Sequence, residues 1–185
     1  MFRNILLYQK DNGGWPKNYD MQAILTAEQK ESLIKAKNEI NTTFDNRTTY
    51  SHIESLAAAY KALNNENYKT AAMKGLDFIL AAQYANGGWP QYFPLEQGYS
   101  RYITFNDDAF GGIMWLLKDI AEGKAEYSFL DKAYKTKLQA SFDKGLDCIL
   151  KTQINDMGKP TAWCQQYNEV TLEPEWARKF EPPSI

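Results

Sequence analysis

Apolar residues recur every three or four positions in two long segments of the chain, with polar residues between them. This spacing places the apolar side chains on one face of an α-helix. The apolar positions are Ile53, Leu56, Ala57, Tyr60 and Leu63 in the first segment, and Phe110, Ile113, Met114, Leu117 and Ile120 in the second. The alternation typical of strands is nearly absent, so the pattern predicts an all-α protein.

An internal repeat adds a second level of order. KGLDFILAAQ at residues 74–83 returns as KGLDCILKTQ at residues 144–153, with an offset of 70 residues. GGWP at residues 13–16 returns at residues 87–90, with an offset of 74 residues. The repeat predicts three copies of one helical unit, the first of which lacks the helix before Gln9. We place the units, within one domain of residues 1–185, at about residues 1–64, 65–122 and 123–185.

The length of the repeat indicates how the units are arranged. Helical units that cannot bury their apolar faces alone stack on their neighbours, in an open solenoid or a closed ring. A period near 70 residues is longer than the common solenoid repeats, and Gly-rich loops fall at the same end of each unit. These features favour an (α/α) toroid-type repeat of helical hairpins, incomplete at both ends of this chain.

Local signals mark some boundaries. Ser51 with Glu54 predicts a capping box, and the run from Thr26 to Gln29 predicts the start of another helix. The GGWP sequence is expected to end a helix, because glycine permits positive φ and proline cannot continue a helix. In the third unit Gly158-Lys159-Pro160 stands in place of GGWP, so a loop of different shape is expected there.

Composition and charge exclude several classes of protein. The chain has 185 residues, 44% of them hydrophobic, and a net charge of −2, as expected for one soluble domain. No stretch approaches the roughly 20 apolar residues of a spanning helix, and the segment after Met1 is too short and polar for a signal peptide. A nucleic-acid binder would show a strong basic excess. We therefore expect a monomer without membrane or nucleic-acid partners.

The scarcity of histidine and cysteine narrows the chemistry further. His52 is the single histidine, which argues against a histidine base or a site with several histidine ligands. Cys148 and Cys164 lack the CxxC spacing of a zinc site. Buried free thiols are the favoured interpretation, and a disulfide is the alternative.

Two short segments place carboxylates directly before predicted helices. TFDNRTT at residues 43–49 precedes one helix, and TFNDD at residues 104–108 precedes its counterpart in the next unit. Helix capping is one interpretation, and for Asp108 alone it is as good as any other. It explains the whole set less well, because all of these residues fall at the same end of the repeat. Oxygen ligands that converge from two loops suit calcium, although neither segment is an EF-hand loop.

Aromatic residues gather in the loops GGWPKNY (residues 13–19) and GGWPQYFP (residues 87–94). Their flat faces could stack on sugar rings. A scaffold role is the alternative, with the preceding glutamine tying the loop to the next helix and the tryptophan packing between units. Repetition favours the scaffold role for Trp15 and Trp89, and leaves Tyr19 and Tyr92 open. The proline-bounded run at residues 172–183 predicts a loop, in which an arginine between two aromatic residues could simply stack or pair.

Taken together, these motifs resemble the pectate lyases of polysaccharide lyase family 10. The matching segments lie in order along nearly the whole chain: NGGWPKNYDM, TTFDNRTTYSHIESLAAAY, NGGWPQYFPL, YITFNDDAF, TAWCQQYNEVTLEP and WARKFEPPS. The resemblance implies a toroid-type fold with a groove for polygalacturonate, cleaved by calcium-assisted β-elimination. It also implies a secreted or periplasmic location.

Motif positions carry this resemblance to individual residues. It implies that Asp45 and Arg178 are catalytic, with Arg178 as the base, and that Asp45 and Asp107 bind Ca²⁺. Substrate contacts are expected at Asn46, Arg47, Asp108, Tyr92 and Trp89. The family's catalytic domain continues beyond the end of this chain with further helices and basic residues.

Two rival functions remain open at this point. Residues 74–89 also look like the Gln–Trp repeat of triterpene cyclases, but that class would need an aspartate-rich acid motif, which Asn106-Asp107-Asp108 matches only in part. The other rival is a non-catalytic fragment that binds pectin. It shares every motif with the lyase, so only an activity assay separates them.

Overall fold

A computed structural model of the chain describes residues 1–176 and confirms the all-α expectation. The α-helices are α1 (Phe2–Tyr8), α2 (Ala27–Lys35), α3 (Tyr50–Leu63), α4 (Glu66–Ala82), α5 (Ala109–Ala121) and α6 (Lys132–Thr152). Short 3₁₀ turns are η1 (Asp45–Arg47), η2 (Tyr99–Arg101), η3 (Asn106–Asp108) and η4 (Ala125–Tyr127). The strands, each of two residues, are β1 (Ile103–Thr104), β2 (Asn155–Asp156), β3 (Lys159–Pro160) and β4 (Gln166–Tyr167).

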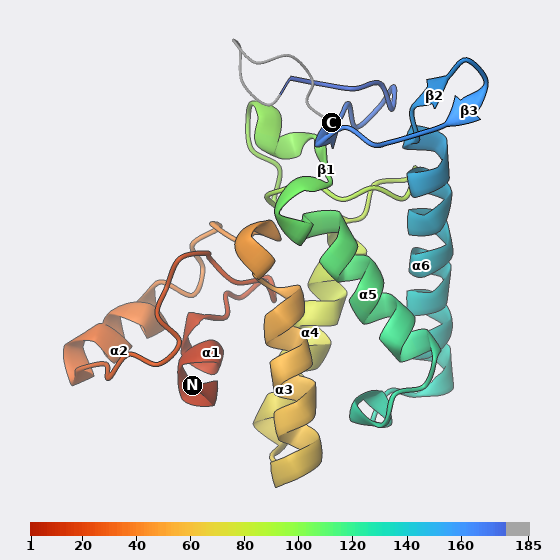
Figure 1. Ribbon diagram of the computed structural model, residues 1–185. Helices are drawn as coiled ribbons and strands as arrows, with labels where there is room; N and C mark the ends of the chain where they lie inside the picture. Colours follow the sequence, from red (N-terminus) through yellow and green to blue (C-terminus); the bar gives the residue numbers. More distant parts are fainter. Residues whose placement is uncertain (177–185) are drawn as a thin grey trace.

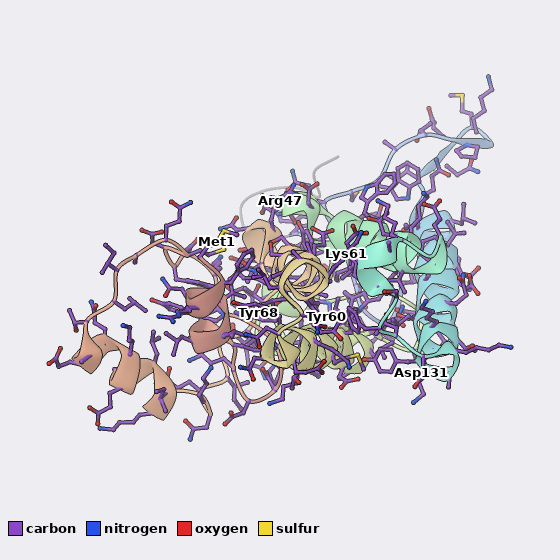
Figure 2. The ribbon with its side chains drawn as sticks, turned by 90° about the horizontal axis from the view of Figure 1, so that it is seen from below. Met1, Arg47, Tyr60, Lys61, Tyr68 and Asp131 are labelled. Atoms are coloured by element: carbon purple, nitrogen blue, oxygen red, sulfur yellow. The ribbon has the colours of Figure 1, made fainter. Side chains whose placement is uncertain are left out.

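The helices form hairpins that stand side by side (Figure 1). Helix α3 packs on α4 and helix α5 packs on α6, while α3 also contacts α5. Asn64, in the left-handed conformation, ends α3, and the Asn65 side chain accepts a hydrogen bond from Asn67 at the start of α4. Figure 1 shows the end of α3 and the start of α6 toward the same, lower end of the hairpins, and Figure 2 labels Tyr60, Lys61 and Asp131 of these segments as seen from below. The loops that precede α3 and α5 lie at the other end.

Glutamine and tryptophan hold successive units together, as predicted for the scaffold role. The Gln9 amide donates to the carbonyl of Ala71 on α4, and the Gln83 amide donates in the same way to Ser141 on α6. The indole N–H groups of Trp15 and Trp89 donate within their own units, to Ile5 and Ile79 at 2.7 and 2.9 Å, while their rings lie against Gly75 and Gly145 of the next unit. The repeat in sequence is therefore also a repeat of structural contacts.

Glycine is required in these loops for two reasons. Gly13 and Gly87 have φ near +95°, at 92° and 97°, where other residues are strained. A Cβ at either position would also collide with a backbone carbonyl of the next marker helix, that of Lys74 or of Lys144. The loops can thus approach the helices closely only with glycine.

The third unit keeps the tryptophan at a different position. The Trp163 indole donates to Ile149 at 2.8 Å, which is the contact that Trp15 and Trp89 make in their units. The loop at Gly158-Lys159-Pro160 therefore differs in shape from GGWP, as expected, and the tryptophan contact is kept. A small hairpin of β2 and β3 lengthens this loop and moves the tryptophan further along the chain.

The first unit and the helix starts bring a confirmation and two corrections. Helix α1 ends just before Gln9, so the unit keeps the last turns of its marker helix. Thr26 and Gln29 form the reciprocal hydrogen bonds of a capping box at α2, as predicted. The capping box of Ser51 with Glu54 was wrong, because α3 begins at Tyr50 and the Ser51 hydroxyl donates to the carbonyl of Arg47.

The hydrophobic core runs between the hairpins. Its largest fully buried side chains include Trp15, Trp89, Tyr50, Phe44, Phe78 and Phe110. Cys148 and Cys164 are buried free thiols, as expected, and burial raises the pKa of Cys148 to about 11. Within residues 1–176, none of the helices combines the length and the apolar character needed to cross a bilayer.

Candidate functional site

Two short turns, η1 and η3, lie in contact at the loop end of the hairpins. Each follows a phenylalanine whose N–H donates to a glutamine carbonyl, Phe44 to Gln91 and Phe105 to Gln165. Antiparallel pairs support both turns, Thr43 with Tyr92 in one case and β1 with β4 in the other, where Thr104 pairs with Gln166. The repeat therefore builds the same support twice and brings the two turns together.

Both turns hold their polar residues in the left-handed backbone conformation. Asn46 and Asp107 have φ of 51° and 55°, and the following residues, Arg47 and Asp108, have φ of 61° and 57°. Thr49 adds a fifth positive φ, at 67°. Non-glycine residues with positive φ are costly and concentrate at functional sites. The turns thus present Asn46, Arg47, Asp107 and Asp108 at a cost that helix capping does not explain.

The capping alternative fails directly for Asp108. This residue is the N-cap of α5, but its side chain accepts no hydrogen bond from the helix. At α3 the N-cap is Thr49, whose side chain does not cap the helix either. Capping of the following helix therefore does not explain the carboxylates of either turn.

Asp45 is the buried acid of the site. Asp45 is 3% exposed. Its carboxylate accepts a hydrogen bond from the backbone N–H of Asn46 at 3.0 Å and forms an ion pair with the Lys17 ammonium. The Lys17 Nζ also lies 5.4 Å from the ring centroid of Tyr92. Burial lowers the pKa of Lys17, but hydrogen bonds and charge interactions with Asp45 and Tyr92 outweigh it and raise the pKa overall. Lys17 is therefore a firmly held cation.

The remaining polar residues of the turns are exposed and paired. Asn46 donates to the Asn18 side chain at 3.1 Å. Arg47 and Asp108 form an ion pair at 3.2 Å between the two turns, with both side chains 67% exposed. Such an exposed pair is worth little in stability, so its groups are available to a ligand.

Asp107 accepts a hydrogen bond from the Asn106 amide at 2.7 Å and is otherwise open to solvent. Carboxylate and amide oxygens are hard donors of the kind that calcium takes. Across residues 1–176, however, no three His, Cys, Asp or Glu side chains converge to hold a metal ion by themselves. A calcium ion here would need further oxygen ligands from outside this set.

Pockets open on both sides of Arg47. One, of about 310 Å³, lies between α3 and α5 and is lined by Arg47, Tyr50, Glu54, Asp108, Gly112 and Trp115. Burial, and then the nearby Asp119, raise the pKa of Glu54, and burial raises that of Tyr50 to about 12. Trp115 presents an indole that is 64% exposed. The other pocket, of about 350 Å³, lies against the loop that contains Asn18.

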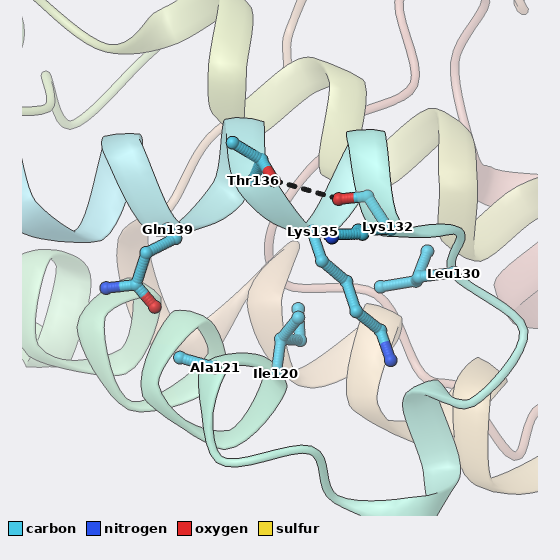
Figure 3. Close-up of a pocket in the computed structure, with 7 residues that line it drawn as sticks. All are labelled: Ile120, Ala121, Leu130, Lys132, Lys135, Thr136 and Gln139. Carbon is cyan, nitrogen blue, oxygen red and sulfur yellow. Dashed lines mark hydrogen bonds between the residues drawn. The ribbon is translucent and has the colours of Figure 1, made fainter.

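A further hollow lies between α5 and α6, away from the two turns (Figure 3). Figure 3 shows Lys135 and Leu130 reaching over it, and the Thr136 hydroxyl donating to the Lys132 carbonyl at 3.0 Å. Its lining residues are Ile120, Ala121, Leu130, Lys132, Lys135, Thr136 and Gln139. It lacks the carboxylates and strained turns of the first site.

Comparison with known proteins decides the family. The sequence profile of a family described as pectic acid lyase matches residues 9–185. The chain belongs to this family.

Solved structures support the pectic acid lyase assignment. A mutant of a family 10 polysaccharide lyase from Cellvibrio cellulosa, in complex with trigalacturonic acid, is 32% identical, with a TM-score of 0.85 over 94% of this chain. A second structure of a family 10 lyase from that organism is 32% identical, with a TM-score of 0.82. The chain spans 52% of the length of each. No curated protein matches it.

The structure brings some of the predicted site residues of this pectic acid lyase family member together and leaves others out of the cluster. It brings together Asp45, Asn46, Arg47, Asp107 and Asp108, and places the half-buried Tyr92 beside Lys17. Trp89 is 1% exposed, and its ring lies against Gly145 of the next marker helix, as expected for the scaffold role. Arg178 lies outside the described residues.

Lys17 is a residue of the candidate site that sequence reasoning missed, paired with Asp45. The signal was present, since Lys17 follows GGWP where the second unit has Gln91. The same kind of departure distinguishes Asp45 from Asn106 at equivalent positions of the two turns. Differences inside an otherwise faithful repeat mark the site.

Proposed function

We propose that this chain carries part of the active site of a pectate lyase that cleaves polygalacturonate by β-elimination. The observation that carries the proposal is the contact of two strained turns, which display Asp45, Asn46 and Arg47 beside Asp107 and Asp108. The match to the pectic acid lyase family, and a family 10 relative in complex with trigalacturonic acid, support this substrate class.

The reaction sets the roles of the residues. β-Elimination removes the C5 proton of a galacturonosyl unit, forms the C4–C5 double bond and breaks the C4–O bond, and the leaving oxygen takes up a proton. Asn46 and Arg47 are exposed donors that would bind uronate oxygens and orient the chain. Asp45 and Lys17 would fix the geometry of the first turn, since their ion pair joins it to the loop of Asn18.

Calcium fits the donor chemistry of the second turn better than that of the first. Asp107 and Asp108 are exposed, whereas Lys17 already neutralises Asp45. We propose that Asp107 is the protein ligand of calcium and that the substrate carboxylate supplies further oxygen ligands. Asp45 could serve as a ligand only if the Lys17 ammonium left it. Bound there, calcium would stabilise the negative charge that develops on that carboxylate.

Arg178 is proposed as the base on the family resemblance. An arginine has a reference pKa of about 12.5 to 13.8, so the neutral form must be favoured by its surroundings for this role. Arg178→Lys retaining full activity would contradict the assignment. A secreted or periplasmic location and a monomeric state are likewise proposals that rest on the family and on composition.

A non-catalytic, pectin-binding form is the second candidate. It would use the same exposed donors, Asn46 and Arg47, to bind the polymer without cleaving it. Products of polygalacturonate digestion separate the candidates by mass. Elimination yields fragments that sum to the mass of the parent chain, whereas hydrolysis adds one water at each cleavage. Fragments of the first kind support the lyase, and an undigested polymer that still binds the protein supports the second candidate.

A further inference from the structure

The pocket on the Asn18 side of Arg47 has an unusual floor. His52 lines it and is 6% exposed, and neither ring nitrogen has a hydrogen-bond partner among the described residues. The imidazole is held between aromatic rings, 5.3 Å from Trp15 and 5.6 Å from Tyr19 between centroids. Buried polar atoms without partners cost stability, so a ligand group that reached them from the pocket would be bound.

Tyr19 lines the same pocket and repeats this pattern. Its ring stacks on Tyr8 at 3.8 Å between centroids, which fixes the position of the phenol. The Tyr19 hydroxyl is buried and also has no partner among residues 1–176. Two rigid aromatic groups that carry three buried, unpaired polar atoms therefore line one pocket of about 350 Å³, a size within the usual range of ligand pockets.

The pocket is almost free of charge. Burial lowers the pKa of His52 to about 4, so the imidazole is neutral near pH 7. Among the residues that line the pocket only Arg47 is charged, and it is paired with Asp108 on its other side. The other polar groups are the amides of Asn18 and Asn46 and two hydroxyl side chains. Because the Arg47 guanidinium pairs with Asp108 outside this pocket, the rest of the lining suits hydroxyl groups better than a carboxylate.

We propose that this pocket is a subsite for one uncharged sugar unit, such as a methyl-esterified galacturonosyl residue, whose hydroxyl groups bind Tyr19 and His52. The inference rests on the proposed pectate lyase function and extends it to the unit beside the reacting one. Asn46 and Arg47 border both the pocket and the turns, so one polysaccharide chain can reach the two.

Calorimetric titration of the whole chain, with chelator present to prevent turnover, tests the subsite. The probes are hexagalacturonate and its methyl-esterified form. Tyr19→Phe and His52→Phe are expected to weaken binding of the esterified hexamer about five- to tenfold, as for one lost hydrogen bond, with less effect on the unesterified one. Neither variant should lower the melting temperature. His52→Gln, which can donate and accept, should retain binding.

Tyr60→Phe is the matched control, since its hydroxyl bonds to Glu66 near the far end of α3. Unchanged affinity of Tyr19→Phe for both hexamers, in a folded protein, would overturn the subsite and leave the lyase proposal standing. Equal weakening for both hexamers would overturn the preference for an uncharged unit. A wild-type chain that binds neither hexamer would overturn the subsite, whereas the lyase proposal is decided separately by the unsaturated product formed with calcium.

Discussion

The Lys17 ammonium forms an ion pair with the Asp45 carboxylate, and this pair connects the first aromatic loop to the first of two strained turns. Asp45 is 3% exposed, whereas the Lys17 side chain is 30% exposed. The buried acid therefore depends on a partner that solvent can reach. This arrangement gives the site a built-in cation before any metal or substrate arrives.

Removing the Lys17 ammonium should lower the free energy of unfolding and increase the stabilisation that an added cation gives. We expect Lys17→Met to lose roughly 1–3 kcal/mol of unfolding free energy, because Asp45 is left buried without its partner. Calcium should then raise the melting temperature of the variant more than that of the wild type. Lys61→Met is the control, since its pair with Glu126 is solvent-exposed and worth about 0–1 kcal/mol. Equal calcium shifts in Lys17→Met and wild type would contradict this account.

Arg47 tests whether the strained turn is kept for function. Arg47→Gly relieves the strain of φ = 61°, which stabilises the fold, but it increases the entropy of the unfolded chain and removes an exposed ion pair, which destabilise it. The free energy of unfolding should therefore change by no more than about 1 kcal/mol. Affinity for hexagalacturonate should nevertheless fall about tenfold. Asp108→Asn breaks the same pair without changing the backbone. A variant that unfolds more easily yet binds normally would assign Arg47 to the scaffold.

Acid should weaken the fold through His52. Its folded pKa of about 4 lies below the ordinary value of 6.5, so the unfolded chain binds the extra proton first as pH falls. The stability that depends on the neutral imidazole is complete above about pH 6.5 and is lost down to about pH 4, by about 3 kcal/mol. Urea unfolding of wild type and His52→Phe between these pH values measures the difference. Parallel pH profiles would contradict it.

The glycine of the repeated loop makes a prediction about the scaffold. Gly87→Ala should cost at least about 2 kcal/mol of unfolding free energy, because its φ is 97° and the new methyl collides with the Lys144 carbonyl. Gly98→Ala is the matched control, with φ of 92° and open space around it, and should cost about 1 kcal/mol. Similar losses in both variants would show that the close approach contributes nothing.

Much of the scaffold could be predicted from the sequence, because the repeat encodes it locally. The helix pattern, the loop glycines and the glutamine tie all depend on short-range spacing that recurs twice. The equivalence of Trp163 with Trp15 and Trp89 was not predicted, because the hairpin of β2 and β3 shifts Trp163 out of register with GGWP. The Ser51 capping box failed because Thr49, in a strained conformation, is the N-cap of α3 instead.

The site could be predicted only in part, for a physical reason. The motifs identified the acidic turns, and their place in the repeat put them at one end of the hairpins. The pairing of Lys17 with Asp45 and the cluster around His52 depend on loops that meet only in the folded chain. No periodicity reports such contacts, although the presence of Lys17 where the second unit has Gln91 was a visible sign.

The most direct test of the central claim is ultraviolet absorbance of the unsaturated product during incubation with polygalacturonate. The account predicts absorbance that grows when calcium is present, stops with excess chelator and is absent for Asp107→Asn with its helical circular dichroism intact. A folded wild-type chain that gives no signal with calcium would contradict catalysis by this chain, and a signal unaffected by chelator would contradict the calcium site.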